Sequence, residues 1–228
     1  CKGIFTCAPP TRHELMQSFT GPELGAMLED GCVIGAHDAF SEELENKLEE
    51  MPEESPELTA LVHLELCNNH FKAIPPILGE LTTLQVLMMN GNRIDKIPME
   101  MGLVNFLRVL HLDHNGIREV PEGSFGQLTN LEELSMTRNK LKIIPDDVKD
   151  MSSLRRLNLD ENQMSTFPHP VAKIAGLEEL SIADNGLMRL SHHFATLTSL
   201  RLLRISGNNL KKLPAEIGNL QSLTYMDV

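Results

Sequence analysis

The segment LRRLNLDENQMSTFP, residues 154–168, is one copy of a motif that the chain repeats seven times. The copies start at Leu61, and each is 23 residues long except the third, which has 24. Every copy places apolar residues as L-x-x-L-x-L, followed by an asparagine at a fixed offset: Asn69, Asn92, Asn115, Asn139, Asn162, Asn185 and Asn208. A period of this length is typical of a solenoid, in which each copy forms one coil.

The L-x-x-L-x-L segment predicts a short strand, because apolar residues at alternate positions give a strand one buried face. All copies run in the same direction, so stacked copies are expected to pair as a parallel sheet. The asparagine follows at the point where the chain leaves the strand. Its amide can both donate and accept hydrogen bonds, and we expect it to satisfy backbone groups in this buried bend.

A proline follows the asparagine by six residues in six of the seven copies: Pro75, Pro98, Pro121, Pro145, Pro168 and Pro214. The sixth copy has Ser191 at this position. Proline fixes its own φ and biases the preceding residue towards extended geometry. The return limb of each coil is therefore expected to begin extended, with at most short helical turns after it.

These copies resemble the leucine-rich repeat over residues 61–228. Their 23-residue form, N-x-L-x-x-I-P-x-x-I-G-x-L-x-x-L, is similar to the intracellular class of Ras-pathway scaffolds, plant Ras-group proteins, Erbin and Scribble, and Roco kinases. The third copy, with VPEGSFGQLTNL at residues 120–131, instead resembles the 24-residue form of extracellular receptors. The resemblance implies a right-handed α/β solenoid with a parallel concave sheet.

Residues 1–57 are expected to form a helical N-terminal extension ahead of an array at 58–228. Helices are predicted over residues 11–19, 20–31 and 41–51, the last with an apolar stripe of Leu44, Leu48 and Met51 among acidic residues. The end of a repeat stack needs a cap with one apolar side. We expect the third helix to supply it, the alternative being an acidic solvated linker. The final residues LTYMDV, 223–228, begin an eighth copy, which suggests that the array is truncated.

The net charge of −12 is unevenly distributed along the chain. Residues 38–57 hold nine acids and one base, whereas residues 58–228 hold 19 acids and 17 bases. This composition argues against a nucleic-acid-binding protein, and an acidic array is expected to be repelled by an anionic membrane. No apolar run approaches the roughly 18–20 residues of a membrane span, so no membrane insertion is expected.

The four cysteines, at positions 1, 7, 32 and 67, form no C-x-x-C motif, and the chain has no N-glycosylation sequon. Both observations favour a reducing compartment and a cytoplasmic location.

The resemblance implies that the residues between the strand leucines face the concave surface and bind partners. One candidate zone is an apolar patch with a polar rim, formed by His63, Glu65, Val86, Met88, Val109, His111 and Asp113. A central zone alternates Glu133, Arg156 and Glu179, which we expect to form a self-satisfied ladder of opposite charges, although Arg156 is kept as a contact candidate. A third zone holds Leu202, Arg204 and the only tyrosine, Tyr225. Leu103 and Phe106 offer a lateral contact, with local packing as the alternative.

Catalytic signatures are lacking: there is no Walker A, G-x-G-x-x-G, G-x-S-x-G or H-E-x-x-H motif. The nearest metal-ligand set is His111, Asp113 and His114 with His63 and Cys67. Copies two apart separate such ligands by about 10 Å, too far for zinc bonds of about 2.0–2.3 Å. We therefore expect no catalysis, cofactor or metal in this chain.

Taken with the resemblance, the sequence predicts a non-catalytic protein–protein interaction module of an intracellular scaffold or signalling adaptor. The family's biology suggests a small GTPase or a phosphatase as partner. Two alternatives stay open: a regulatory repeat domain of a larger enzyme, such as a Roco-like kinase or a cyclase, and an extracellular receptor or adhesion ectodomain.

Overall fold

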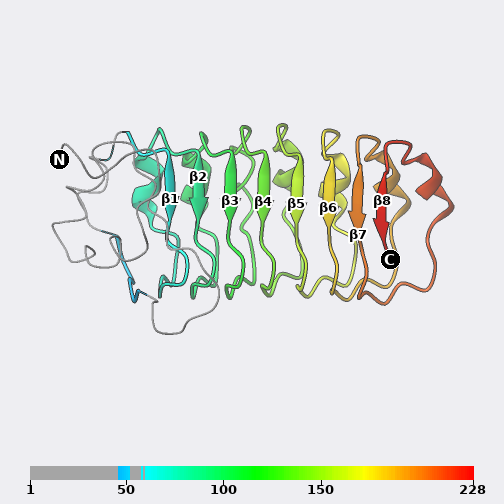
Figure 1. Cartoon of the computed structure of the whole chain (residues 1–228), viewed down its shortest axis with the longest axis horizontal. Helices are drawn as coiled ribbons and strands as arrows, with labels where there is room; N and C mark the ends of the chain where they lie inside the picture. Colours follow the sequence, from blue (N-terminus) through cyan, green and yellow to red (C-terminus); the bar gives the residue numbers. More distant parts are fainter. Residues whose placement is uncertain (1–45, 52–57, 59) are drawn as a thin grey trace.

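The computed structural model describes residues 46–51, 58 and 60–228 (Figure 1). Eight strands form one parallel sheet in chain order. Each strand has three residues: β1 (His63–Glu65), β2 (Val86–Met88), β3 (Val109–His111), β4 (Glu133–Ser135), β5 (Arg156–Asn158), β6 (Glu179–Ser181), β7 (Leu202–Arg204) and β8 (Tyr225–Asp227). The parallel sheet predicted from the repeat is thereby confirmed, and the eighth strand is the one that the final six residues begin.

The sheet register follows the repeat without any slip. The central leucines pair in succession, as Leu64↔Leu87 and Leu87↔Leu110 illustrate, and the flanking positions pair likewise. These central leucines are buried, so neighbouring coils stack a continuous apolar row behind the sheet. A slip by one residue would turn that row to solvent, and burial therefore fixes the register.

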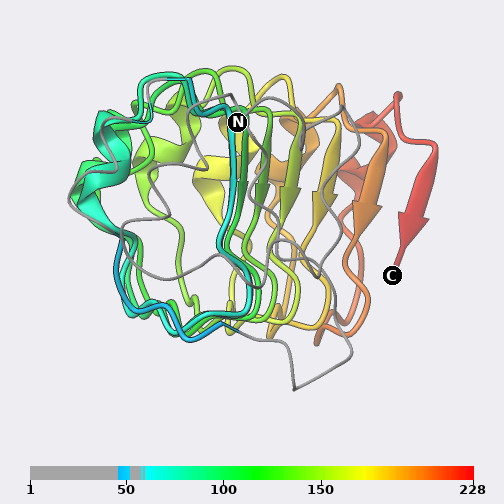
Figure 2. The same ribbon diagram turned by 60° about the vertical axis from the view of Figure 1, so that its left-hand side comes forward.

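The return limbs lie opposite the sheet, so that each coil is a flattened ring (Figure 2). They contain short 3-10 helices: η2 (Pro76–Glu80), η3 (Met99–Leu103), η4 (Asp146–Asp150), η5 (His169–Lys173), η6 (His192–Thr196) and η7 (Ala215–Asn219). The residue before each of them has extended geometry, for example Pro98 with φ −74° and ψ 154°. Where serine replaces proline, the Ser191 side chain accepts the N–H of His193, and η6 forms all the same. The expected extended limb with short helical turns is confirmed.

The third return limb, in the 24-residue copy, has turns in place of a 3-10 helix. Phe125 is fully buried there, and Gly123 has a φ of 91°. A side chain of the next coil holds this loop: Asp147 Oδ2 accepts N–H groups from Gly123, Phe125 and Gly126 at 3.1, 2.9 and 2.7 Å. One carboxylate oxygen thus accepts three backbone N–H groups of the loop, in addition to the turn bonds from Ser124 N–H to Pro121 O and from Leu128 N–H to Phe125 O.

The repeated asparagines form a ladder through the bends after the strands. Asn162 is typical: its Nδ2 donates to the carbonyls of Met136, Leu159 and Asp160, and its Oδ1 accepts the N–H of Leu141 in the preceding coil. Each such side chain satisfies backbone groups of two coils at once. The expected role of the asparagine is confirmed.

The residue before each asparagine has a left-handed backbone. The seven are Asn68, Gly91, His114, Arg138, Glu161, Asp184 and Gly207, with φ between 49° and 67°. Five of them are not glycine, although non-glycine residues adopt this conformation at a cost. At Gly91, glycine avoids both this backbone cost and the clash of a Cβ with the Asn68 side chain, which would otherwise have to move.

The N-terminal segment differs from the expectation. Residues 46–51 contain no helix, so the capping helix predicted over 41–51 is wrong in that part; residues 41–45 and the two earlier helices lie outside the described residues. The segment instead continues the coil stack. Leu48 N–H donates to Asn69 Oδ1 (3.1 Å), its carbonyl accepts from His70 N–H (2.9 Å), and Leu48 and Met51 pack against the core.

The sequence carried a signal for this extra turn. Asn46, Leu48, Met51 and Pro52 stand 23 residues before Asn69, Phe71, Ile74 and Pro75, so N-x-L-x-x-M-P is one more copy of the bend. The many glutamates around it favoured the helix interpretation. Across the described ranges, no helix has the length and apolar character needed to cross a membrane.

Candidate functional site

The concave surface carries all three predicted zones, because the side chains beside each central leucine point out of the sheet. In the first zone the register sets Val86 beside Val109 and Met88 beside His111. The two valines and Met88 are half-buried, and Glu65 is buried with its carboxylate 2.8 Å from His63 Nε2. The zone is therefore contiguous, and Glu65 is largely withdrawn from the surface. That these residues bind a partner stays a prediction.

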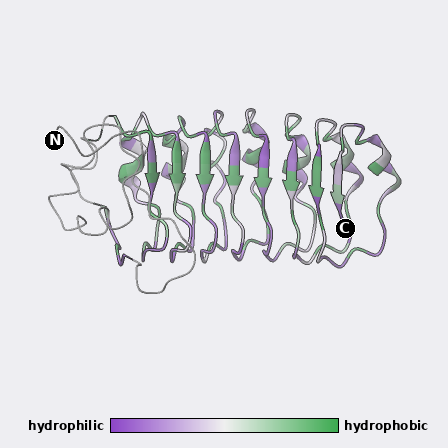
Figure 3. Cartoon of the chain, in the orientation of Figure 1, coloured by the Kyte–Doolittle hydropathy of each residue, from purple (hydrophilic) through white to green (hydrophobic). Residues whose placement is uncertain are grey.

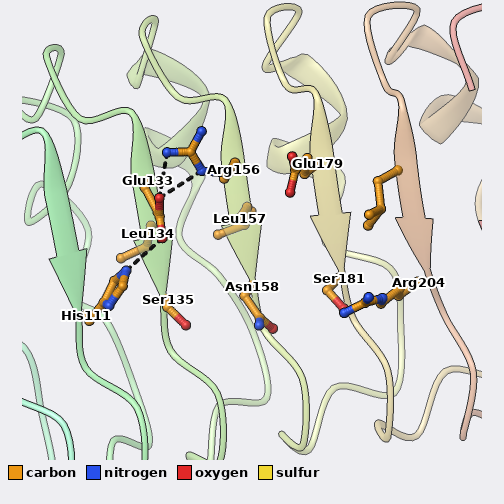
Figure 4. Close-up of a pocket in the computed structure, with 11 residues that line it drawn as sticks. His111, Glu133, Leu134, Ser135, Arg156, Leu157, Asn158, Glu179, Ser181 and Arg204 are labelled. Atoms are coloured by element: carbon orange, nitrogen blue, oxygen red, sulfur yellow. Dashed lines mark hydrogen bonds and ion pairs between the residues drawn. The ribbon is translucent and has the colours of Figure 1, made fainter. Parts of the chain in front are cut away.

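A hollow of about 230 Å³ occupies the middle of this surface, across β3 to β7 (Figure 4). Its lining comprises His111, Glu133, Leu134, Ser135, Arg156, Leu157, Asn158, Glu179, Ser181, Leu202 and Arg204. The hollow thus joins the central charged zone to part of the third zone, which the sequence had not connected.

Glu133 organises one side of the hollow. Its Oε1 lies 2.8 Å from His111 Nε2, and its Oε2 accepts from Arg156 Nε at 2.7 Å. Burial pushes the pKa of Glu133 up, but the hydrogen bonds from Arg156 and His111 outweigh burial and hold the pKa below its ordinary value. The hydrogen bond to Glu133 raises the pKa of Arg156 in turn. Glu133 thus accepts hydrogen bonds from both neighbours, and the three side chains form a polar wall on one side of the hollow.

The expected ladder of Glu133, Arg156 and Glu179 is only half formed. Arg156 turns to Glu133, and within the described residues Glu179 makes no ion pair (Figure 4). Arg204, at the far end of the hollow, likewise has no carboxylate within ion-pair distance among the described residues, although its guanidinium lies 5.7 Å from the centre of the Tyr225 ring. Leu202 lies beside Glu179 in the register, and Arg204 is two residues further along the same strand. The hollow therefore ends in an unpaired acid, an unpaired base and an aliphatic side chain, and Tyr225 lies next to Arg204 outside its lining.

A row of aspartates stiffens the far edge of the concave surface. Asp113 Oδ1 accepts from Ser135 Oγ (2.6 Å) and from Thr137 N–H (2.7 Å). Asp160, two coils further along, repeats the arrangement and accepts from Ser181 Oγ (2.8 Å) and Ala183 N–H (2.6 Å). Burial raises the pKa of Asp160 above its ordinary value, and these hydrogen bonds offset only part of that rise.

Asp113 is consequently a structural acceptor as well as a rim residue. The shared offset of Asp113 and Asp160 in their copies could have indicated this role.

The possible metal ligands do not come together. Across the described residues, no group of three His, Cys, Asp or Glu side chains has a geometry that could hold a metal ion. Cys67 is buried, and burial raises the pKa of its thiol to about 11, which keeps it protonated. His114 Nε2 lies 2.9 Å from Arg138 Nη1, on the turn beyond the strand.

The lateral pair lies on the return limb of the second copy. Leu103 is 63% exposed and Phe106 47% exposed, so both leave apolar surface in solvent. Local packing does not bury them, and a lateral contact at this place stays a prediction.

Comparison with known proteins shows the same repeat. A leucine rich repeat family model matches residues 106–164, and a second matches residues 199–220. No curated protein matches the chain. Among solved structures, a leucine-rich-repeat protein of Leptospira interrogans is similar, with 30% identity and a TM-score of 0.80, covering 93% of this chain and 52% of the other.

Two further structures are similar. An internalin of Listeria monocytogenes has 25% identity and a TM-score of 0.66, covering 76% of this chain and 49% of its own. The ectodomain of the Arabidopsis thaliana membrane receptor kinase GASSHO1/SCHENGEN3, solved in complex with CASPARIAN STRIP INTEGRITY FACTOR 2, has 29% identity and a TM-score of 0.68. That match covers 78% of this chain and 22% of the receptor. The chain spans about half the length of the bacterial proteins that it matches.

Proposed function

Because this chain is a leucine-rich-repeat protein, we propose that it binds a protein partner through the hollow of its concave face and carries no catalysis of its own. The observation that carries the proposal is the pair of unpaired charges, Glu179 and Arg204, next to Leu202 in the lining of the hollow. Unpaired charges beside an apolar contact give specificity to a partner of complementary charge.

Tyr225 strengthens the proposal. Tyrosine and arginine are enriched among the residues that dominate interface energies, and here they lie in contact on neighbouring strands. The wall of His111, Glu133 and Arg156 is already held in place by its own hydrogen bonds. A partner would therefore meet a preorganised surface and would lose little side-chain entropy there.

The cellular setting that we propose is a cytoplasmic scaffold or signalling adaptor, with a small GTPase or a phosphatase as partner class. The 23-residue copies, the few scattered cysteines and the lack of a glycosylation sequon support it. The plant receptor ectodomain among the similar structures favours the alternative of an extracellular receptor, for which the 24-residue third copy is a matching feature.

The test uses selection of binders from a random peptide library on the immobilised protein. Selected peptides should lose at least tenfold in affinity with Arg204→Glu or Glu179→Lys. Glu216→Lys, on the exposed face of η7, is the matched control and should leave affinity unchanged. Peptides whose binding is insensitive to both concave variants would refute the hollow as the binding site.

A further inference from the structure

The turns after the seven asparagines form a face that we call the basic face. It comprises residues 70–73, 93–96, 116–119, 140–143, 163–166, 186–189 and 209–212. Nine bases lie on it: Lys72, Arg93, Lys96, Arg118, Lys140, Lys142, Arg189, Lys211 and Lys212. Its acids are Asp95 and Glu119, and the partial coil before it adds Glu49 and Glu50 at the N-terminal end, where Glu49 pairs with Lys72. The rest of residues 58–228 keeps eight of the 17 bases and 17 of the 19 acids, so the fold separates the two signs.

The basic face is one continuous surface. Neighbouring turns are joined by backbone hydrogen bonds, such as Gly116 N–H to Ile94 O (2.7 Å) and Lys140 N–H to Ile117 O (2.8 Å). In Figure 1 these turns follow the strand arrowheads along the lower edge of the solenoid, and Figure 3 shows hydrophilic residues recurring there. Seven coils at a strand spacing of about 4.8 Å give the face a length of roughly 30 Å.

The charges of this face are available to a partner. All nine bases are exposed. Among the described residues, only Lys72 is in an ion pair, with Glu49 at 3.2 Å. Two large apolar side chains stand among the bases: Ile143 is 70% exposed and Met188 is 67% exposed. These two side chains offer apolar contact to a partner that the bases attract.

We propose that the basic face binds the surface of an anionic lipid bilayer. Basic residues near such a surface each contribute attraction that falls off within a Debye length, so a row of them acts together. Ile143 and Met188 would enter the boundary between headgroups and acyl chains, as apolar residues of interfacial segments do.

The composition of the face favours a bilayer over other anionic partners. Six of the nine bases are lysines, which protein interfaces disfavour relative to arginine. No aromatic side chain is exposed on the face, whereas single-stranded nucleic acids are bound by stacking on aromatics. The expectation that an acidic array is repelled by an anionic membrane rested on charge counted along the chain. In the fold, nine of the 17 bases of residues 58–228 gather on one face, which that count does not show.

Co-sedimentation with vesicles tests the proposal on the full chain. Vesicles of equal parts phosphatidylcholine and phosphatidylserine should bind the protein, and pure phosphatidylcholine vesicles should not. Binding should weaken as salt increases. The double variant Lys140→Glu/Lys142→Glu should lower the apparent affinity at least tenfold. Ile143→Ser/Met188→Ser should weaken the binding that persists at high salt.

The control is Lys149→Glu/Lys173→Glu, which makes the same change in net charge at exposed positions of η4 and η5 and should bind as the parent does. Melting temperatures of all variants establish that they fold. Equal losses in both charge variants, or no preference for phosphatidylserine, would overturn the proposal. Binding to polyglutamate or to duplex DNA without binding to vesicles would also overturn it and would assign the face to that other class of partner.

Discussion

Asn69 Oδ1 accepts the backbone N–H of Leu48 across 3.1 Å, the same bond that Asn92 makes to Phe71 and Asn162 makes to Leu141. The donor, Leu48, lies one coil before the first L-x-x-L-x-L copy. The hydrogen bonds of the asparagine ladder therefore reach back to a coil that precedes the first strand. Residues 46–51 therefore form part of a further coil, and Glu49 of this coil pairs with Lys72 of the next.

Leu48 should behave as a core residue of the first coil. Leu48→Ala is expected to lower the free energy of unfolding by about 1–2 kcal/mol, since a half-buried leucine contributes less than a fully buried one. Hydrogen exchange at the amide of His70, which donates to Leu48, should accelerate. Lys47→Ala, at the exposed neighbouring position, is the control. Equal effects from the two changes would contradict this account of residues 46–51.

Asn162 should be among the most sensitive positions of the array. Asn162→Ala leaves three carbonyls and one N–H without their side-chain partner in a buried bend. The expected loss is about 2–3 kcal/mol of unfolding free energy, measured by denaturant titration. Gln163→Ala changes the exposed next residue and should cost little. If Asn162→Ala lowers the free energy of unfolding no more than Gln163→Ala does, water can replace the hydrogen bonds of the asparagine side chain.

Asp147 should stabilise the helix-free loop of the third copy. Asp147→Ala removes the acceptor of three N–H groups, and we expect a loss of about 2–3 kcal/mol together with faster hydrogen exchange at Gly123, Phe125 and Gly126. Asp146→Ala breaks only an exposed pair with Lys149 and should cost little stability. Unchanged exchange in the loop would refute the role of Asp147.

Glu133 should make stability depend on pH in the acidic range. Its pKa is lower in the folded protein than in the unfolded chain, so the charged carboxylate stabilises the fold above its unfolded pKa of about 4.3. That contribution is lost as the pH falls through the folded pKa. Solvent screening limits it to about 1 kcal/mol or less, because Glu133 and Arg156 are partly exposed.

The measurement compares the parent with Glu133→Gln between pH 7 and pH 3. The difference in unfolding free energy should shrink as the pH falls, and Arg156→Met should raise the pKa of Glu133 in a carboxyl NMR titration. Glu179→Gln, which breaks no ion pair seen in the described residues, is the control and should lower the free energy of unfolding at pH 7 less than Glu133→Gln does. A constant difference for Glu133→Gln would contradict the lowered pKa.

The repeat made most of the fold predictable, and the errors fell where two patterns competed. The strands, the parallel order and the extended limbs follow from residues that recur in every copy. Residues 46–51 were misread because leucines at helical spacing among glutamates outweighed the match of Asn46 to the ladder. Burial of Leu48 decides the question, because tertiary contact with the next coil overrides local helix propensity.

For the candidate site, the sequence predicted which residues share the concave surface but not how their side chains pair. Alternation placed Glu133, Arg156 and Glu179 on one face, yet sequence offered no means to decide which glutamate the arginine would choose. In the structure Arg156 turns to Glu133, which His111 also holds, and this choice leaves Glu179 unpaired. Side-chain partners depend on distances and rotamers across coils, which no spacing rule contains.

By itself, the sequence determined that this chain is a stack of coils with a parallel sheet, because each copy can bury its leucines only against its neighbours. Tertiary structure alone decided where the charges act. Bases that lie about one repeat apart in the chain come to share one edge of the solenoid. In the hollow, the carboxylate of Glu133 is paired and that of Glu179 is not. The physical reason is that stacking turns sequence period into spatial adjacency, whereas electrostatics depends on distance and exposure.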